Sequence, residues 1–194
     1  MKNLKKVLGV VILGATMAFT TSNKKTIVID VGHGGFDSGI AANGYDEKDI
    51  TLEIANKIKA LNKSSNFEII LTRETDDFIP IHERANQINE LNPDYVISLH
   101  VNSAADKERS GKEIFVSDEN IQKDQSGDLA MRLFYYFNDS NVQIKKADFH
   151  LLENVQYPIV LVELGYLTNN KDLEVLTSEK GQLELAKSIL SAVE

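Results

Sequence analysis

Two histidines and two glutamates occur at positions where their side chains could bind a metal ion and activate water. They are His33, Glu47, His100 and Glu163. Catalytic zinc sites use three protein ligands, drawn mainly from histidine and carboxylate side chains, and keep one coordination position for water. His33, Glu47 and His100 provide two imidazoles and one carboxylate. We therefore predict that these three residues bind zinc.

Glu163 remains outside this ligand set and is expected to be the catalytic acid and base. It follows the apolar residues 159–162, and burying an unpaired carboxylate among such residues costs free energy. A carboxylate here is therefore expected to be paired or functional. Zinc lowers the pKa of a bound water to about 7. Glu163 would accept a proton from that water and later donate it to the departing amine of a cleaved amide.

Each of these residues also has a structural interpretation when it is considered alone. A histidine at the end of a strand often has a structural or capping role, and Glu47 could serve only as a favourable acid in the first turn of a helix. Two histidines and one carboxylate also bind ferrous iron in oxygenases. The other two histidines, His82 and His150, are expected to have structural or surface roles. A shared location for all four candidates is what would favour a hydrolytic zinc site.

The elements that must position these residues alternate between strands and helices. Five short runs rich in Ile, Val and Leu predict buried strands, at residues 26–31, 68–72, 95–99, 113–116 and 159–162. Apolar residues at spacings of three and four predict helices, at about residues 47–61, 81–91, 126–138 and the end of the chain. This alternation predicts an α/β fold, with three α/β/α layers around a mainly parallel central sheet.

Three of the predicted strands end directly at candidate site residues. His33 follows the first strand, His100 the third and Glu163 the last. In such sheets, ligands bind beyond the carboxyl ends of the strands. Glu47 precedes the first helix, whose N-cap is expected at Asp46, and a short connection would bring it to the same edge. We therefore expect the four candidates to meet at one edge of the sheet.

The composition is that of one globular domain, which we place at residues 26–194. The 194-residue chain has 42% hydrophobic and 26% charged residues, and shows no linker or repeat after residue 25. It has no cysteine, which excludes disulfides, thiolate ligands and a cysteine nucleophile. Its net charge of −8 disfavours binding to nucleic acid or to anionic membrane surfaces.

The N-terminal residues 1–22 have the layout of a secretory signal peptide. Three lysines precede an uncharged stretch at residues 7–19, which is shorter than the roughly 20 apolar residues needed to cross a membrane. An N-terminal anchor or a buried helix is the alternative. Cleavage would remove three of the 21 basic residues and none of the 29 acidic residues, leaving a net charge of −11. We expect a periplasmic or secreted protein, with no stable membrane insertion after the signal is removed.

Six sequence blocks resemble, in the same order, those of the zinc-dependent N-acetylmuramoyl-L-alanine amidases of the AmiA/AmiB/AmiC type. They are residues 29–39, 47–48, 71–76, 84–86, 98–102 and 162–169, and the resemblance covers nearly all of residues 26–192. It implies that His33, Glu47 and His100 bind Zn²⁺. It also implies that Glu163 is the catalytic glutamate. One departure is Val31, where the family usually has proline.

The resemblance further implies that the substrate is peptidoglycan, cut between N-acetylmuramic acid and L-alanine during cell-wall remodelling or daughter-cell separation. Regulated members of the family carry a long helical insertion that plugs the site after the second zinc histidine. Only 62 residues separate His100 from Glu163, so we expect an open site. An activator protein is compatible with the sequence but not implied by it. Two other functions stay open: a catalytically silent peptidoglycan-binding protein, and a metallopeptidase that cuts within the stem peptide.

Several charged and polar residues outside the four candidates are expected to hold the site in place through hydrogen bonds and ion pairs. Asp30 is a candidate to accept a hydrogen bond from a zinc histidine, which usually donates its second N–H to an acceptor. Arg73 with Asp76, and Arg84 with Asn86, are expected to form ion-pair and hydrogen-bond scaffolding rather than to take part in the chemistry.

Overall fold

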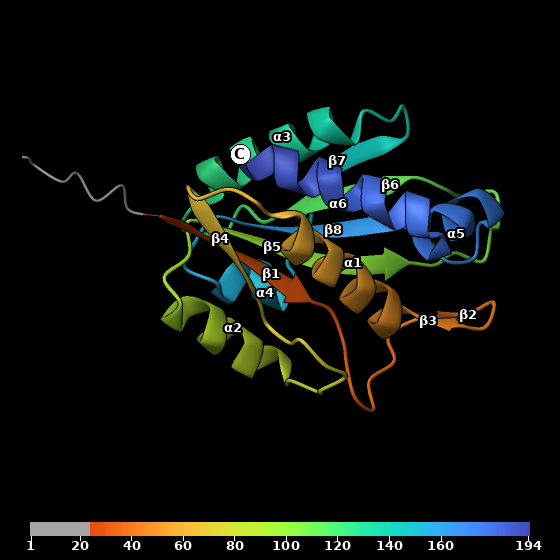
Figure 1. Ribbon diagram of the computed structural model, residues 1–194, viewed down its shortest axis with the longest axis horizontal. Coiled ribbons are helices and arrows are strands. Elements are labelled where there is room, and N and C mark those ends of the chain that lie inside the picture. The colour runs from red at the N-terminus through yellow and green to blue at the C-terminus, as the bar shows by residue number, and fades with distance from the viewer. Residues whose placement is uncertain (1–23) are drawn as a thin grey trace, which may run out of the picture.

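The computed structural model describes residues 24–194, so the predicted signal peptide at residues 1–22 lies outside the described residues. A six-stranded sheet carries helices on both faces (Figure 1). Its strands are β1 (Lys25–Val31), β4 (Phe67–Leu71), β5 (Tyr95–Asn102), β6 (Lys112–Val116), β7 (Val142–Lys146) and β8 (Ile159–Tyr166). The helices are α1 (Glu47–Leu61), α2 (Ile81–Glu90), α3 (Lys123–Phe137), α4 (His150–Asn154), α5 (Asn170–Thr177) and α6 (Glu179–Val193). A small hairpin pairs β2 (Ala41–Ala42) with β3 (Tyr45–Asp46). The predicted three-layer α/β fold is confirmed.

The strand order brings the three strands with candidate residues together. The sheet runs β4-β1-β5-β8-β6-β7, and every neighbouring pair is parallel except β6 and β8. Val31 is the register partner of Leu99, and His100 is the partner of Glu163. The carboxyl ends of β1, β5 and β8 therefore lie side by side, as the parallel arrangement requires.

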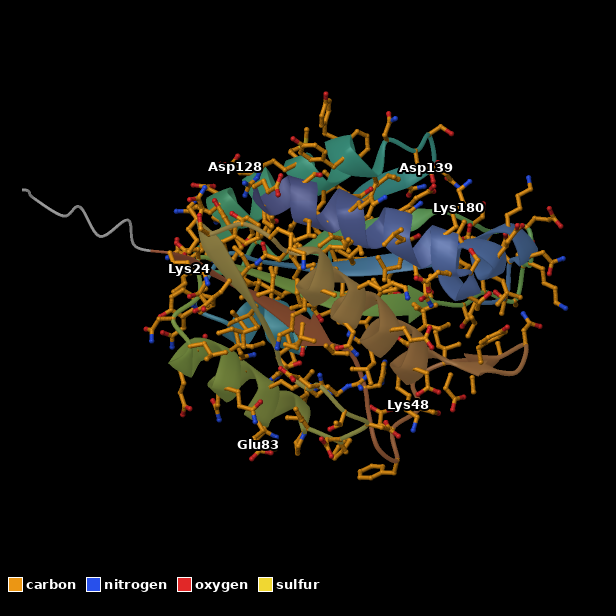
Figure 2. The ribbon with its side chains drawn as sticks, in the orientation of Figure 1. Lys24, Lys48, Glu83, Asp128, Asp139 and Lys180 are labelled. Atoms are coloured by element: carbon orange, nitrogen blue, oxygen red, sulfur yellow. The ribbon has the colours of Figure 1, made fainter. Side chains whose placement is uncertain are left out.

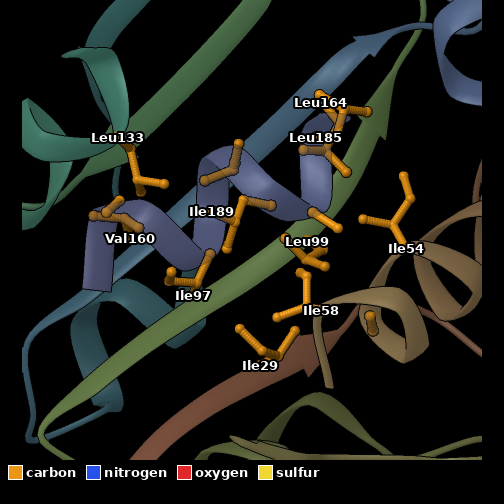
Figure 3. Close-up of a cluster of buried hydrophobic side chains, with 14 of the residues drawn as sticks. Ile29, Ile54, Ile58, Ile97, Leu99, Leu133, Val160, Leu164, Leu185 and Ile189 are labelled. Carbon is orange, nitrogen blue, oxygen red and sulfur yellow. The ribbon is translucent and has the colours of Figure 1, made fainter. Parts of the chain in front are cut away.

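Both faces of the sheet are covered, which explains the continuous apolar runs of its strands. Figure 1 shows α1, α3 and α6 over one face and α2 with α4 over the other. Ile29, Ile97 and Val160 belong to the larger core cluster, where they pack with residues of α1, α3 and α6 (Figure 3). Val28 and Leu161 belong to a smaller cluster with residues of α2 and α4. Alternate side chains of one strand thus face opposite layers.

Several short or polar elements were not predicted from the sequence. The unpredicted strand β7 lies at the sheet edge, and most of its side chains are partly or fully exposed. Charged residues such as its lysines protect edges from further pairing, but they also hide the apolar pattern of a strand. The hairpin and the short helices α4 and α5 were missed as well. In residues 24–194, no helix is both long and apolar enough to span a membrane.

Candidate metal centre

His33 lies in a tight turn just after β1. Its φ is +58°, a left-handed conformation that is unfavourable for a residue with a side chain. Two backbone hydrogen bonds between Gly34 and Asp37, of 2.9 and 3.2 Å, close the turn. Conformations of this kind persist only where the surrounding structure imposes them, and they cluster at functional sites. The turn therefore fixes the position of the His33 imidazole.

Glu47 is the first residue of α1, and only 2% of it is exposed. Asp46 is the N-cap of α1 as predicted, although the Asp46 side chain accepts no hydrogen bond from the backbone N–H groups of the first turn of α1. The hairpin before α1 returns the chain to the sheet edge. Ile40 N donates to Glu47 Oε2 at 2.9 Å, and Val101 N donates to Glu47 Oε1 at 2.9 Å. The carboxylate is thus held between the hairpin and β5.

His100 on β5 completes a compact group of three potential metal ligands. The ligand atoms of His33, Glu47 and His100 all lie within 4.8 Å of one another. Glu47 Oε1 lies 3.2 Å from His33 Nε2 and 2.9 Å from His100 Nδ1. The two imidazole rings are nearly perpendicular, at 83°, with centroids 5.0 Å apart. One nitrogen of each ring therefore faces the same carboxylate oxygen, and this donor set is one that zinc uses in catalytic sites.

Two glycines leave the space that these ligands occupy. A Cβ atom on Gly39 would lie 2.5 Å from Glu47 Oε2 and 2.6 Å from His33 Cδ2. A Cβ atom on Gly32 would lie 2.8 Å from His100 Cε1. All three distances are shorter than any ordinary contact between non-bonded atoms. The close approach of the three ligands therefore depends on glycine at both positions.

Electrostatic coupling within the group alters its protonation. Burial by itself lowers the pKa of His33, but the hydrogen bonds and negative charges of Glu47 and Asp37 raise it to about 9. Burial raises the pKa of Glu47, yet its contacts with His100 and His33 outweigh burial and lower that pKa well below its usual range. The group therefore holds an ionised carboxylate beside a protonated imidazole at neutral pH. A metal that binds here must displace that proton.

Glu163 lies on β8, next to His100 in the sheet register. Its Oε2 atom is buried and has no hydrogen-bond partner among the residues that the structure describes. Burial, together with the negative charges of Glu47 and Glu113, raises the pKa of Glu163 to about 7, against the opposing effect of His100 and His33. A carboxyl group with this pKa can both accept and donate a proton near neutral pH.

The four candidates line one cavity of about 450 Å³, a volume typical of small-molecule sites. We call four of its other lining residues the apolar wall: Ile81, Phe149, Leu151 and Leu161. They come from the first turn of α2, the start of α4 and β8. His150 also lines the cavity, although the sequence indicated only a structural or surface role for it. His82 is exposed on α2.

The chain matches one protein family over nearly all of its described residues. The sequence model of the family described as N-acetylmuramoyl-L-alanine amidase matches residues 27–194. The chain belongs to this family. The enzyme class that the sequence resemblance implied is therefore confirmed.

Individual proteins are similar to this chain over most of its length. The chain is 33% identical over 173 residues to the uncharacterized protein YqiI of Bacillus subtilis (strain 168), covering 88% of this chain and 84% of the relative. It is 30% identical over 159 residues to the N-acetylmuramoyl-L-alanine amidase CwlM of Bacillus licheniformis, covering 78% of this chain and 60% of the relative. This chain thus spans less than two thirds of CwlM.

Solved structures of amidases share the fold. The catalytic domain of the amidase CwlV from Bacillus (Paenibacillus) polymyxa var. colistinus has a TM-score of 0.79 at 28% identity, covering 87% of this chain and 96% of that domain. An N-acetylmuramoyl-L-alanine amidase from Clostridium difficile 630 has a TM-score of 0.80 at 28% identity, covering 88% of this chain and 95% of that one.

The acceptor for the His33 ring in this amidase fold is Asp37 rather than Asp30. His33 Nδ1 donates to Asp37 Oδ2 at 2.9 Å. Asp30, which was expected to contact a zinc histidine, accepts hydrogen bonds from Thr72, Arg84 and Ser98 instead. The expectation for Asp30 is wrong because its buried carboxylate is occupied by these three partners and accepts no hydrogen bond from a histidine of the described residues. The position of Asp37, four residues after His33 in a glycine-rich turn, was the signal that could have identified it.

Arg73 and Arg84 support the turn after β1, but not with the expected partners. Arg84 Nη1 pairs with Asp30 Oδ1 at 2.9 Å, and Arg84 Nη2 donates to the carbonyl oxygen of His33. Arg73 Nη2 donates to the carbonyl oxygens of Gly32 and Lys48, each at 2.8 Å. Both guanidinium groups therefore satisfy backbone carbonyls of the turn that carries a candidate ligand, which is the scaffolding role expected for them.

Proposed function

We propose that this chain hydrolyses the amide bond between N-acetylmuramic acid and L-alanine in peptidoglycan, using zinc held by His33, Glu47 and His100. The observation that carries this proposal is the convergence of two imidazole nitrogens on one carboxylate oxygen, beside the buried Glu163 Oε2 atom, which has no hydrogen-bond partner within residues 24–194. The amidase family of the chain supports the reaction.

The protein side chains have separable roles in this reaction. His33, Glu47 and His100 would hold the metal, and Asp37 would keep the His33 ring oriented through the hydrogen bond to its Nδ1 atom. When bound, zinc supplies a Lewis acid that lowers the pKa of water and polarises a carbonyl group. Asp37 and the glycines fix the ligands before substrate arrives, which reduces the cost of organising the site.

Glu163 is the proton-transfer group of the proposed mechanism. Its pKa of about 7 leaves a large fraction of the carboxyl group ionised at neutral pH, so it can accept the proton of the attacking water. The protonated form then donates that proton to the amino group of L-alanine as the amide bond breaks. The buried Oε2 atom has no hydrogen-bond partner in the described part of the chain, which makes the group available for both transfers.

The cell envelope is the proposed location, because the substrate is there and the N-terminal residues have the layout of a secretory signal. We propose residues 1–22 as the signal and residues 26–194 as the catalytic domain. The CwlD amidase of Clostridioides difficile has been solved in complex with the GerS lipoprotein. For the present chain, an activator protein is compatible with the sequence but not implied by it.

Mass spectrometry of digested muropeptides tests the proposed reaction. The purified protein is incubated with defined muropeptides, with zinc or with a chelator. We expect release of free stem peptide and peptide-free sugar with zinc, and no release with the chelator. Cleavage within the stem peptide would indicate a metallopeptidase, and binding without cleavage by the folded, zinc-loaded protein would indicate a silent binding protein.

Two glutamate variants test the role of Glu163. Glu163→Gln removes the titrating group at nearly unchanged volume, and loss of general acid–base catalysis typically lowers the rate by about 100- to 10,000-fold. Glu90→Gln, at an exposed position on α2, is the matched control and should leave the rate unchanged. Equal rates for the two zinc-loaded variants would rule out the proposed role of Glu163.

A further inference from the structure

The apolar wall presents large hydrophobic side chains directly beside the proposed reaction centre. Leu151 and Leu161 are buried in its base, while 50% of Ile81 and 41% of Phe149 are exposed. Phe149 packs against Phe115 with ring centroids 5.2 Å apart, which fixes its orientation. Exposed apolar side chains that line a cavity mark a ligand-binding surface.

A tilted pair of phenylalanines lies on the loops that follow β1 and precede α2. Phe36 and Phe78 have ring centroids 4.0 Å apart at an interplanar angle of 34°, and Phe36 is 84% exposed. Phe36 lies three residues after His33, and Phe78 lies three residues before Ile81. The aromatic pair is therefore tied by short segments both to the proposed metal ligands and to the apolar wall.

Polar contacts make the loop that carries Phe36 rigid. Gly35 N donates to Asp76 Oδ1 at 2.7 Å. Lys48 Nζ donates to the carbonyl oxygen of Gly35 at 2.8 Å and to Asp76 Oδ2 at 2.7 Å. Figure 2 labels Lys48 beside this loop. An exposed aromatic ring on a braced turn can bind a ligand with little loss of conformational entropy.

The proposed substrate has a sugar half and a stem-peptide half, and the charge of the cavity favours the sugar half. The cavity lining holds no lysine or arginine within the part of the chain that the structure describes, and the chain has a net charge of −8. The stem peptide of peptidoglycan carries ionised groups, which an uncharged apolar wall does not compensate. The sugar half is uncharged once its lactyl carboxyl group is part of the amide bond. Its pyranose rings present flat C–H faces, and its N-acetyl groups present methyl groups.

We propose that the apolar wall and the Phe36–Phe78 pair form the subsite for the sugar half of the substrate, with the stem peptide directed away from them. This inference rests on the proposed amidase function, because that function defines the two halves. Phe149 and Phe36 would contact the C–H faces of N-acetylhexosamine rings, and Ile81 would contact an N-acetyl methyl group. The proposed ligand is thus a neutral N-acetylhexosamine chain.

Binding measurements with the two separate halves test the subsite. Wild-type zinc-loaded protein is titrated with a neutral N-acetylglucosamine tetrasaccharide, which has no lactyl carboxyl group, and, separately, with free stem peptide, by calorimetry or NMR. We expect Phe36→Ala and Phe149→Ala each to weaken binding of the sugar by about five- to tenfold, the loss typical of an aromatic contact residue. Binding of the stem peptide should not change.

Tyr135→Ala is the matched control, because Tyr135 is a 74% exposed aromatic residue on α3 and does not line the cavity. If Phe149→Ala disturbs α4, the result for Phe36→Ala decides the test, because Phe36 is mostly exposed and its truncation should not disturb the fold. Unchanged sugar binding in Phe36→Ala, or a parallel loss of peptide binding, would overturn the subsite. Muropeptide hydrolysis tests the proposed function separately: an inactive protein that still binds sugar through these residues would refute the function but keep the subsite.

Discussion

Gly39→Ala should weaken zinc binding far more than its backbone strain alone can explain. Gly39 has a φ of +64°, and an alanine in this left-handed region costs about 1–2 kcal/mol of stability. Its Cβ atom would also lie 2.5 Å from Glu47 Oε2 and 2.6 Å from His33 Cδ2. Ordinary contacts between such atoms are about 3.5 Å, so the two proposed ligands must move by roughly 1 Å. Displacements of this kind lower metal affinity by about 10- to 100-fold.

Gly44→Ala separates the two effects. Gly44 has a φ of +83°, and a Cβ atom there would have no neighbour within 4 Å among residues 24–194. This variant should show a similar loss of stability in urea unfolding but bind zinc like the wild type. Zinc affinity is measured by competition with a chromophoric chelator, after circular dichroism confirms that both variants are folded. Equal zinc affinities for Gly39→Ala and Gly44→Ala would refute the assignment of His33 and Glu47 as ligands.

Three further predictions concern the framework around the site. Arg84→Ala leaves Asp30 buried without its ion-pair partner, so urea unfolding should show a loss of about 3–5 kcal/mol; a loss below about 1 kcal/mol would contradict the scaffolding role. The pKa of Glu113 is lowered in the folded protein from 4.5, because the contacts with Lys145, Tyr166 and Arg109 outweigh burial. The stability difference between wild type and Glu113→Gln should therefore be full above pH 4.5 and shrink as the pH falls below it; a pH-independent difference would refute this. Ile58→Ala, at a fully buried position, should cost about 2–5 kcal/mol in the same assay, whereas a negligible cost would contradict tight packing under α1.

Local pattern was enough to predict the architecture of this chain. The five predicted strands and the four longer helices all exist. Runs of β-branched residues, and apolar residues spaced by three and four positions, indicate directly which side chains are buried. The rule that parallel strands present ligands at their carboxyl ends then placed His33, His100 and Glu163 at one edge. The structure brings these residues and Glu47 to the same cavity.

Elements with polar or short sequences could not be predicted in the same way. Strand β7 is held by parallel pairing with β6, a contact between distant segments that leaves no periodic signal in the exposed edge strand. Helix α4 has only five residues, too few to show a helical period. Its N-cap Phe149 and its residue Leu151 nevertheless line the cavity.

The sequence by itself determined which residue types could form the site and at which edge of the sheet they would gather. Only the tertiary structure decided their partners: Asp37 rather than Asp30 contacts His33, Arg84 pairs with Asp30, and an apolar wall faces the ligand group. The physical reason is that strand identity follows from the burial pattern of a few consecutive residues. Hydrogen-bond partners instead depend on turn geometry and on the packing of segments far apart in the chain, which local spacing does not encode.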